Sequence, residues 1–80
     1  MPTLVFERGF KIIIYYNDHE PAHVHVKKAG FEARIQLEPI QTIENYGFNQ
    51  SDLKIALELV LKHQASLINT WQTIYGYDDE

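Results

Sequence analysis

Alternation between apolar and polar positions marks the first half of the chain as β-rich. Four segments are rich in β-branched and aromatic side chains, and they comprise residues 3–7, 10–16, 22–28 and 31–37. Turn-forming pairs at 8–9 and 29–30 and a loop sequence at 17–21 separate these segments, and Glu38-Pro39 ends the fourth. The pattern predicts four antiparallel strands.

The second half of the chain follows a helical period, in which apolar positions recur at intervals of three and four. One helical face carries Leu53, Leu57, Val60, Leu67, Trp71 and Ile74. Asn49 is expected to cap the helix, and the polar Gln64 on the apolar face indicates a kink or a change of helix. The pattern predicts one long helix or two shorter helices within residues 49–75, followed by a flexible acidic tail at 76–80.

These elements fit a single domain of residues 1–80, β-rich over 1–40 and helical over 49–75. We expect an α+β fold in which the C-terminal helix or helices pack on one face of a four-stranded antiparallel sheet. Ile55 and Leu59 form a second apolar strip, away from the main helical face. Because a small core needs only one strip, we expect a homodimer or another partner to cover these two residues.

Composition narrows the classes of function. The 80 residues include no cysteine, which excludes disulfides and thiolate metal sites. A formal net charge of −4 argues against a general nucleic-acid coat protein, although five of the seven basic side chains lie within residues 8–34. The N-terminal sequence lacks the pattern of a signal peptide, and no apolar run is long enough to span a bilayer. We therefore expect a cytoplasmic protein without membrane contact.

Groups that bind metals or transfer protons are densest in "DHEPAHVHV", residues 18–26, which contains His19, His23 and His25. Because side chains alternate across a strand, His23 and His25 share one face, opposite the valines that enter the core. The same face is expected to carry Tyr15, Lys27, Glu32, Arg34 and Gln36. The sequence thus predicts a polar, histidine-bearing face on the side of the sheet away from the helix.

Metal-free acid–base catalysis is the first chemistry that fits this face. His23 and His25 would transfer protons, and His19 would orient the substrate or act as a third catalytic group. Lys27 and Arg34 would hold a phosphate and Tyr15 could stack on a base. RNA cleavage through the 2′-hydroxyl would need these groups and no cofactor. A ribonuclease-like activity is therefore our leading hypothesis.

Two other uses of the same residues compete with catalysis. His19, His23 and His25 are spaced H-x-x-x-H-x-H, and three imidazoles can bind Zn, Ni or Fe and leave a position open for water or substrate. A non-catalytic module that binds a metal or a protein partner is therefore the alternative hypothesis. A purely structural role, with histidines paired to Glu32 or to the backbone on a solvated strand face, is the third.

Several segments also resemble a known family. They are "YYNDHEPAHVHV" (15–26), "FEARIQLEPI" (31–40), "GFNQSDL" (47–53) and the late Trp71. They resemble small, mostly bacterial proteins catalogued as domain of unknown function 4160, which carry a Y-x-N-D/E-H-x-P-P-H-V-H-V segment, then G-F-S and a helix with a late tryptophan. Here Ala22 replaces the second proline of that motif, and Asn49 replaces the usual cap serine.

The resemblance has implications for function as well. Members of that family resemble one half of two-gene cassettes of toxin–antitoxin type, often beside a second small protein known as domain of unknown function 2442. The resemblance therefore implies a toxin–antitoxin component with a small cognate protein partner. A toxin that acts on RNA through the histidine-bearing face is the specific form of this hypothesis.

Overall fold

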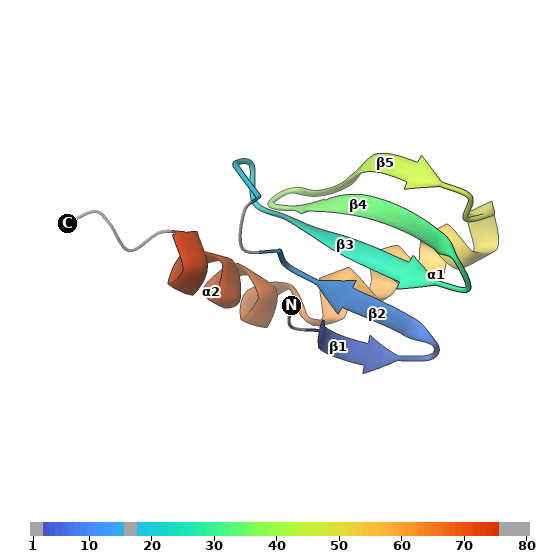
Figure 1. Cartoon of the computed structure of the whole chain (residues 1–80), viewed down its shortest axis with the longest axis horizontal. Coiled ribbons are helices and arrows are strands. Elements are labelled where there is room, and N and C mark those ends of the chain that lie inside the picture. Colours follow the sequence, from blue (N-terminus) through green and yellow to red (C-terminus); the bar gives the residue numbers. More distant parts are fainter. Residues whose placement is uncertain (1–2, 16–17, 76–80) are drawn as a thin grey trace.

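An antiparallel sheet followed by two helices makes up the fold (Figure 1). The computed structural model describes residues 3–15 and 18–75, so the expected tail at 76–80 lies outside the described residues. The elements are β1 (Thr3–Glu7), β2 (Phe10–Ile13), β3 (His23–Lys28), β4 (Phe31–Leu37), β5 (Ile40–Tyr46), α1 (Gln50–Lys62) and α2 (Gln64–Tyr75). The predicted α+β class is confirmed, with five strands instead of four.

The strands lie side by side in chain order, β1-β2-β3-β4-β5, and every pair is antiparallel. The turns Arg8-Gly9 and Ala29-Gly30 join β1 to β2 and β3 to β4. All four turn residues have positive φ angles, between 54° and 85°, which is typical of the type I′ turns that suit twisted hairpins. Both turns fall where the sequence predicts them.

The fifth strand corrects the prediction of four. Glu38-Pro39 does not end the sheet; it forms a two-residue turn, and β5 then returns along β4 with Leu37 opposite Ile40. Proline is tolerated there because its missing N–H lies in the turn, outside the ladder of hydrogen bonds. An irregularity in pairing follows, since Arg34 is opposite Glu44 and Ile35 is opposite Thr42. Ile43 is therefore an extra residue in β5.

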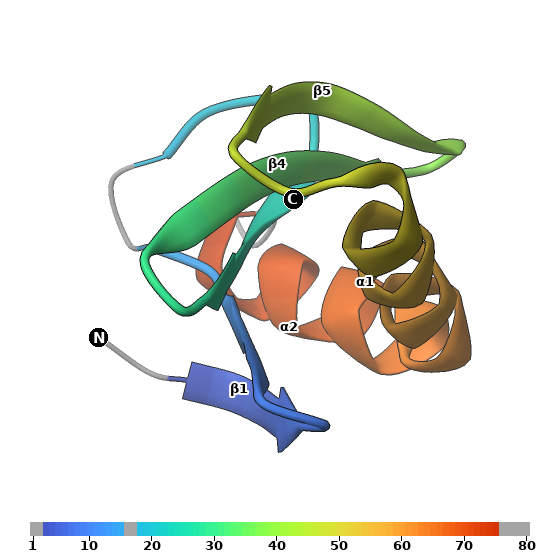
Figure 2. The same ribbon diagram turned by 90° about the vertical axis from the view of Figure 1, so that its right-hand side faces the viewer.

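Both helices cover the same face of the sheet (Figure 2). Alternate positions of the central strands supply the core beneath them, including Val24, Val26, Ala33, Ile35 and Leu37, all fully buried. Asn49 caps α1 as expected, because its side chain accepts the backbone N–H of Asp52 at 2.8 Å. Within the described part of the chain, no helix has the length and apolar character needed to cross a membrane.

The break between the helices falls at His63, beside the polar position that the sequence indicates. The Gln64 amide donates to the Leu37 carbonyl at 2.7 Å. The polar side chain on the apolar face therefore satisfies a backbone group at the end of β4. The two-helix form of the prediction is therefore the correct one.

Ile55 and Leu59, expected from the sequence to form an exposed strip for a dimer, pack within the chain instead. Leu59 is buried in the core at 3% exposure, and Ile55 is partly buried against that core. The buried residues of α1 are Ala56, Leu59 and Val60, so the face that α1 turns to the sheet includes Leu59 and adjoins Ile55. Both side chains therefore pack within the chain, and unpaired apolar surface at these positions no longer supports the expected homodimer.

Candidate metal centre

The face opposite the helices carries the polar positions that alternation predicts. His25 is opposite both Ile13 of β2 and Arg34 of β4, and His23 is opposite Gln36. The expectation of a solvated face is wrong for both strand histidines, because His23 is 2% exposed and His25 is 9% exposed. The described part of the connection between β2 and β3 at residues 18–22 lies on this side of the sheet (Figure 2), and Asp18 there contacts both imidazoles. His19, on that connection, is exposed.

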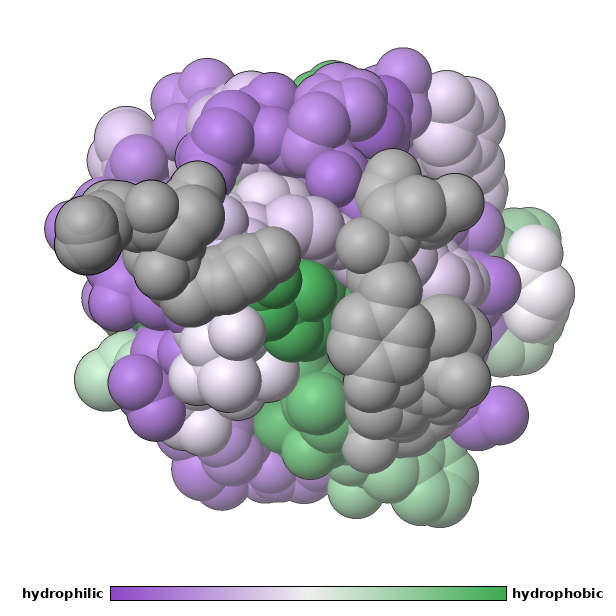
Figure 3. All heavy atoms as spheres, turned by 60° about the vertical axis from the view of Figure 1, so that its left-hand side comes forward, coloured by the Kyte–Doolittle hydropathy of each residue, from purple (hydrophilic) through white to green (hydrophobic). Residues whose placement is uncertain are grey.

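Aromatic rings enclose the two buried imidazoles. The Tyr15 ring meets His25 edge-on with 4.6 Å between ring centroids, and Trp71 of α2 lies 5.4 Å from His23 by the same measure. The Trp71 indole N–H also donates to the Glu20 carboxylate at 3.3 Å, and this hydrogen bond joins the β2–β3 connection to α2. The described surface at this end of the molecule combines hydrophilic areas with apolar ones (Figure 3). The contacts with Tyr15 and Trp71 therefore account for part of the burial of the two imidazoles.

The Nδ1 atom of each buried imidazole is committed to an oxygen that can only accept. His23 Nδ1 lies 2.8 Å from the Pro21 carbonyl oxygen, and His25 Nδ1 lies 2.9 Å from Glu32 Oε2. A carbonyl and a carboxylate have no proton to give, so Nδ1 is the protonated nitrogen in both rings. In the neutral form of each imidazole, the lone pair is then on Nε2.

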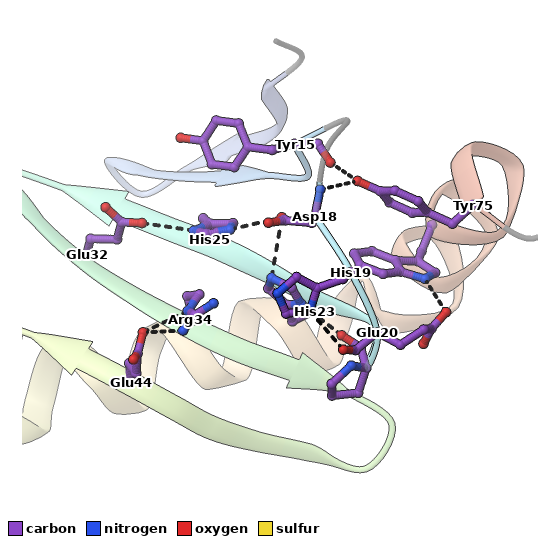
Figure 4. Close-up of polar contacts among 12 residues, drawn as sticks. Tyr15, Asp18, His19, Glu20, His23, His25, Glu32, Arg34, Glu44 and Tyr75 are labelled. Carbon is purple, nitrogen blue, oxygen red and sulfur yellow. Dashed lines mark hydrogen bonds and ion pairs between the residues drawn. The ribbon is translucent and has the colours of Figure 1, made fainter.

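Both Nε2 atoms point at one oxygen atom, Asp18 Oδ2 (Figure 4). The distances are 3.1 Å from His25 and 3.3 Å from His23. His23 Nε2 is buried and has no hydrogen-bond partner among the described residues, because its approach to Asp18 lacks hydrogen-bonding geometry. With both imidazoles neutral, two lone pairs face a carboxylate, and either a cation between them or a proton on a ring makes this arrangement favourable.

The arrangement has the donor atoms of a metal site, and its two distances to Asp18 are of the size that such a site needs. One donor atom from each of Asp18, His23 and His25 lies within 4.8 Å of the others. With metal–ligand bonds of roughly 2.0–2.1 Å, neighbouring ligand atoms lie about 2.9 Å apart in an octahedral site and about 3.3 Å apart in a tetrahedral one. The two distances to Asp18 match these values. Glu32 and the Pro21 carbonyl supply the second set of contacts by which metal-binding histidines are normally oriented.

The third member of the cluster is the main difference from the sequence-based ligand set. The sequence predicts His19 with His23 and His25, whereas the structure places Asp18 beside the two strand histidines. His19 Nδ1 contacts the Glu20 carbonyl at 3.0 Å, and its ring centroid is 6.4 Å from that of His23. Asp18 enters the site because the connection folds back over β3, and its backbone is held there from α2 by Tyr75.

Two cations expected to hold a phosphate are engaged with neighbours on the same face. Arg34 pairs with Glu44, with Nη2 at 2.6 Å and Nε at 2.8 Å from the same carboxylate oxygen, and this contact lowers the pKa of Glu44. The Lys27 ammonium lies 5.7 Å from the centre of the Tyr15 ring, and hydrogen bonding to the Tyr15 phenol raises the pKa of Lys27. Tyr15 itself meets His25 edge-on. Tyr15 therefore lies beside the cluster, and the role of all three residues in substrate binding stays a prediction.

Asp18 and Glu32 extend the site beyond the histidines. Asp18 directly precedes the first histidine of the motif, so its carboxylate was available in the sequence, but its loop composition favours an assignment as a turn former. Glu32 matches the structural alternative, in which a histidine pairs with it. The structural alternative accounts for the contacts of both Nδ1 atoms. It does not account for the convergence of both Nε2 atoms on Asp18, which depends on where the β2–β3 connection places Asp18.

Comparison with protein families adds one finding to this geometry. Residues 9–72 match the model of the family described as Domain of unknown function (DUF4160). The chain belongs to this family. The match includes every residue of the centre and most of α2, which agrees with the resemblance seen in the histidine motif. Searches of curated proteins and of solved structures found no significant match.

Proposed function

We propose that this protein binds a divalent transition metal ion through Asp18, His23 and His25. The observation that carries the proposal is the convergence of two buried Nε2 atoms on one carboxylate oxygen, 3.1 and 3.3 Å away. Two imidazoles and one carboxylate are a donor set used by Fe(II) and by Zn²⁺. The burial of both rings supports the proposal because it removes the water that would otherwise solvate the lone pairs.

Three protein ligands leave at least one coordination position free. Metal centres of this kind bind water or substrate, whereas structural zinc sites are closed by four protein ligands. Glu32 would strengthen the His25 ligand, because a carboxylate that accepts Nδ1–H makes the other ring nitrogen a better donor. The proposed centre is therefore of the open type, suited to polarising a bound water or a substrate oxygen.

RNA cleavage by a toxin–antitoxin component remains a prediction from the sequence and is less well supported than metal binding. It needs one histidine Nε2 free to take a proton and cationic groups free to hold a phosphate. Both Nε2 atoms are directed at Asp18, and Arg34 is paired with Glu44. The cognate protein partner and the cytoplasmic location are also still predictions.

Titration of the chelator-treated protein with Co²⁺ tests the metal proposal, because bound cobalt has visible absorption that reports its coordination. The wild type should bind one equivalent. Asp18→Asn should weaken binding by more than about a hundredfold, since it removes a charged ligand without changing the side-chain volume. His19→Ala is the matched control and should bind as the wild type does. Equal loss in both variants, or no binding by the wild type, would contradict the proposed ligand set.

An RNA-cleavage assay on the same preparations distinguishes the two hypotheses. A metal-free acid–base pair would give a bell-shaped pH profile and activity that survives chelator. Activity that disappears with chelator and returns with metal would assign the histidines to a metal centre. Growth of a bacterial host that expresses the protein alone, compared with a His23→Ala, His25→Ala double variant, tests the toxin hypothesis separately.

A further inference from the structure

A second feature lies at the end of the sheet where the β1–β2 and β3–β4 turns meet the solvent (Figure 1). A cavity of about 350 Å³ opens between these two turns, and its lining includes Gly9, Lys11, Lys27, Lys28, Phe31 and Glu32. Pockets of this size hold small molecules in many proteins. None of the three lysines is a ligand of the proposed metal centre, although Glu32 lines the cavity and also contacts His25.

The charge of this cavity is opposite to that of the whole chain. Three lysines and one glutamate line it, although the protein has a formal net charge of −4. Lys11 and Lys27 are directly opposite each other on paired strands, an arrangement in which like charges destabilise a sheet. Glu32 lies opposite Lys27 on the other side and offsets one of these charges. An excess of positive charge remains around the cavity.

The lysines are held in place by neutral groups. The Lys28 ammonium lies 4.7 Å from the centre of the buried Phe10 ring, and its stem runs beside Gly9, where a Cβ atom would be 3.3 Å from Lys28 Cε. The Tyr15 phenol supports Lys27 from the opposite face. The rings position the ammonium groups of Lys27 and Lys28 without cancelling their charge, so an anion can still be attracted to them.

We infer that this cavity binds a phosphoryl group through Lys11 and Lys27, with Lys28 adding positive charge from the other face of the sheet. A compact anion with two charges suits several lysine point charges better than a planar carboxylate does, since arginine is the residue that matches a carboxylate fork. Phe31 gives the cavity an apolar wall for the organic part of a ligand. A small phosphomonoester and the backbone of a nucleic acid share this chemistry. The inference stands on the cavity alone and does not require the metal.

Calorimetric titration of the full chain in the presence of chelator tests the site. The probes are inorganic phosphate, phenyl phosphate and a short single-stranded RNA without terminal phosphates. Lys11→Gln and Lys27→Gln should each weaken binding of the effective probe by about fivefold or more, as expected for the loss of one partly exposed ion pair. Lys54→Gln removes the same charge from the exposed surface of α1 and should change binding by less than about twofold.

Each outcome has a defined meaning. Binding of phosphate or phenyl phosphate that depends on Lys11 supports the site and identifies a small ligand as its source, whereas binding of RNA alone, with the same dependence, identifies the polymer. Equal loss in Lys54→Gln would show general attraction of anions and would overturn the inference, as would no binding of any probe. Asp18→Asn should leave phosphate binding unchanged, which keeps this test independent of the metal proposal.

Thermal unfolding separates a binding role of Lys11 from a purely stabilising one. Because Lys11 is opposite Lys27, Lys11→Gln should leave the melting temperature of the ligand-free protein unchanged or raise it while it weakens phosphate binding. A lower melting temperature together with unchanged binding would assign Lys11 to stability alone and overturn its role in the site.

Discussion

The hydroxyl of Tyr75, near the end of α2, accepts the backbone N–H of Asp18 at 2.9 Å and donates to the carbonyl of Tyr15. Asp18 and Tyr75 are 57 positions apart, and this contact joins the last turn of the helix to the connection that covers the histidines. The hydroxyl contacts the backbone of both Tyr15 and Asp18. It therefore fixes the position from which the Asp18 carboxylate reaches His23 and His25.

Tyr75→Phe should lower metal affinity without removing a ligand. The ring can keep its stacking on Trp71, 4.3 Å away, while the two backbone contacts of the hydroxyl are lost. Loss of an outer contact typically costs about 10–100-fold in metal affinity, and the lost hydrogen bonding should cost about 1 kcal/mol of stability. Cobalt titration and chemical denaturation measure both effects. Tyr46→Phe, at an exposed tyrosine of β5, is the control and should bind metal normally.

Zn²⁺ should stabilise the wild type and should fail to stabilise Asp18→Asn. At a free concentration a hundred times the dissociation constant, binding to the folded state adds about 2.7 kcal/mol, which for a domain of this size raises the melting temperature by roughly ten degrees or more. The response should weaken in acid, because protons compete with the metal for its ligand atoms. Calorimetric melting curves with and without zinc measure it.

The same variant gives a sharper result in chelator at neutral pH. An asparagine at position 18 offers an N–H to the nearby Nε2 lone pairs, so the metal-free variant should melt no lower than the metal-free wild type. If Asp18 were instead a structural partner of two charged imidazoles, its loss would destabilise the protein by about 3 kcal/mol or more. That result would sink the metal proposal.

Gly47→Ala should destabilise the protein more than Gly30→Ala does. Both glycines have positive φ angles, 110° and 85°, so each substitution introduces backbone strain of about 1–3 kcal/mol. A Cβ at Gly47 would also clash with the Phe31 ring, whereas no described residue beyond its chain neighbours lies within 4 Å of a Cβ at Gly30. Denaturation of both variants isolates the steric contribution. Equal losses would mean that the Phe31 ring moves aside without cost.

The contacts of Glu7 predict an acid-sensitive contribution to stability. Lys62 donates to this carboxylate at 2.6 Å and His63 at 3.0 Å, and these hydrogen bonds hold the pKa of Glu7 below its ordinary value of 4.5. A depressed pKa in the folded state adds stability above the unfolded pKa, and this stability is lost as the pH falls below about 4.5. Glu7→Gln should therefore be less stable than the wild type near neutral pH, with a difference that shrinks in acid. A constant difference across the pH range would contradict this assignment.

The sequence specifies the local structure of this chain better than its tertiary contacts. Alternation predicts β3 and β4 and the face that each side chain takes, because the period of a strand is a local property. The positive-φ turns at 8–9 and 29–30 follow from their glycines for the same reason. The fifth strand is missed because a proline within a short turn has the same composition as a proline that ends a strand.

The site is only partly predictable for a different reason. The spacing of His23 and His25 on one strand brings the two imidazoles together regardless of the rest of the fold. The choice between Asp18 and His19 depends on how the connection folds over the sheet, and that path is fixed by Trp71 and Tyr75, more than 50 positions away. Pattern alone contains no information on such a contact.

The order of the strands has a kinetic consequence. Each strand pairs only with its neighbours along the chain, so the sheet can form from adjacent hairpins without closing long loops. The contact between Asp18 and Tyr75 spans 57 positions and requires α2 to be docked. The centre is therefore completed after the sheet, and a metal ion that binds there should slow unfolding much more than it accelerates folding.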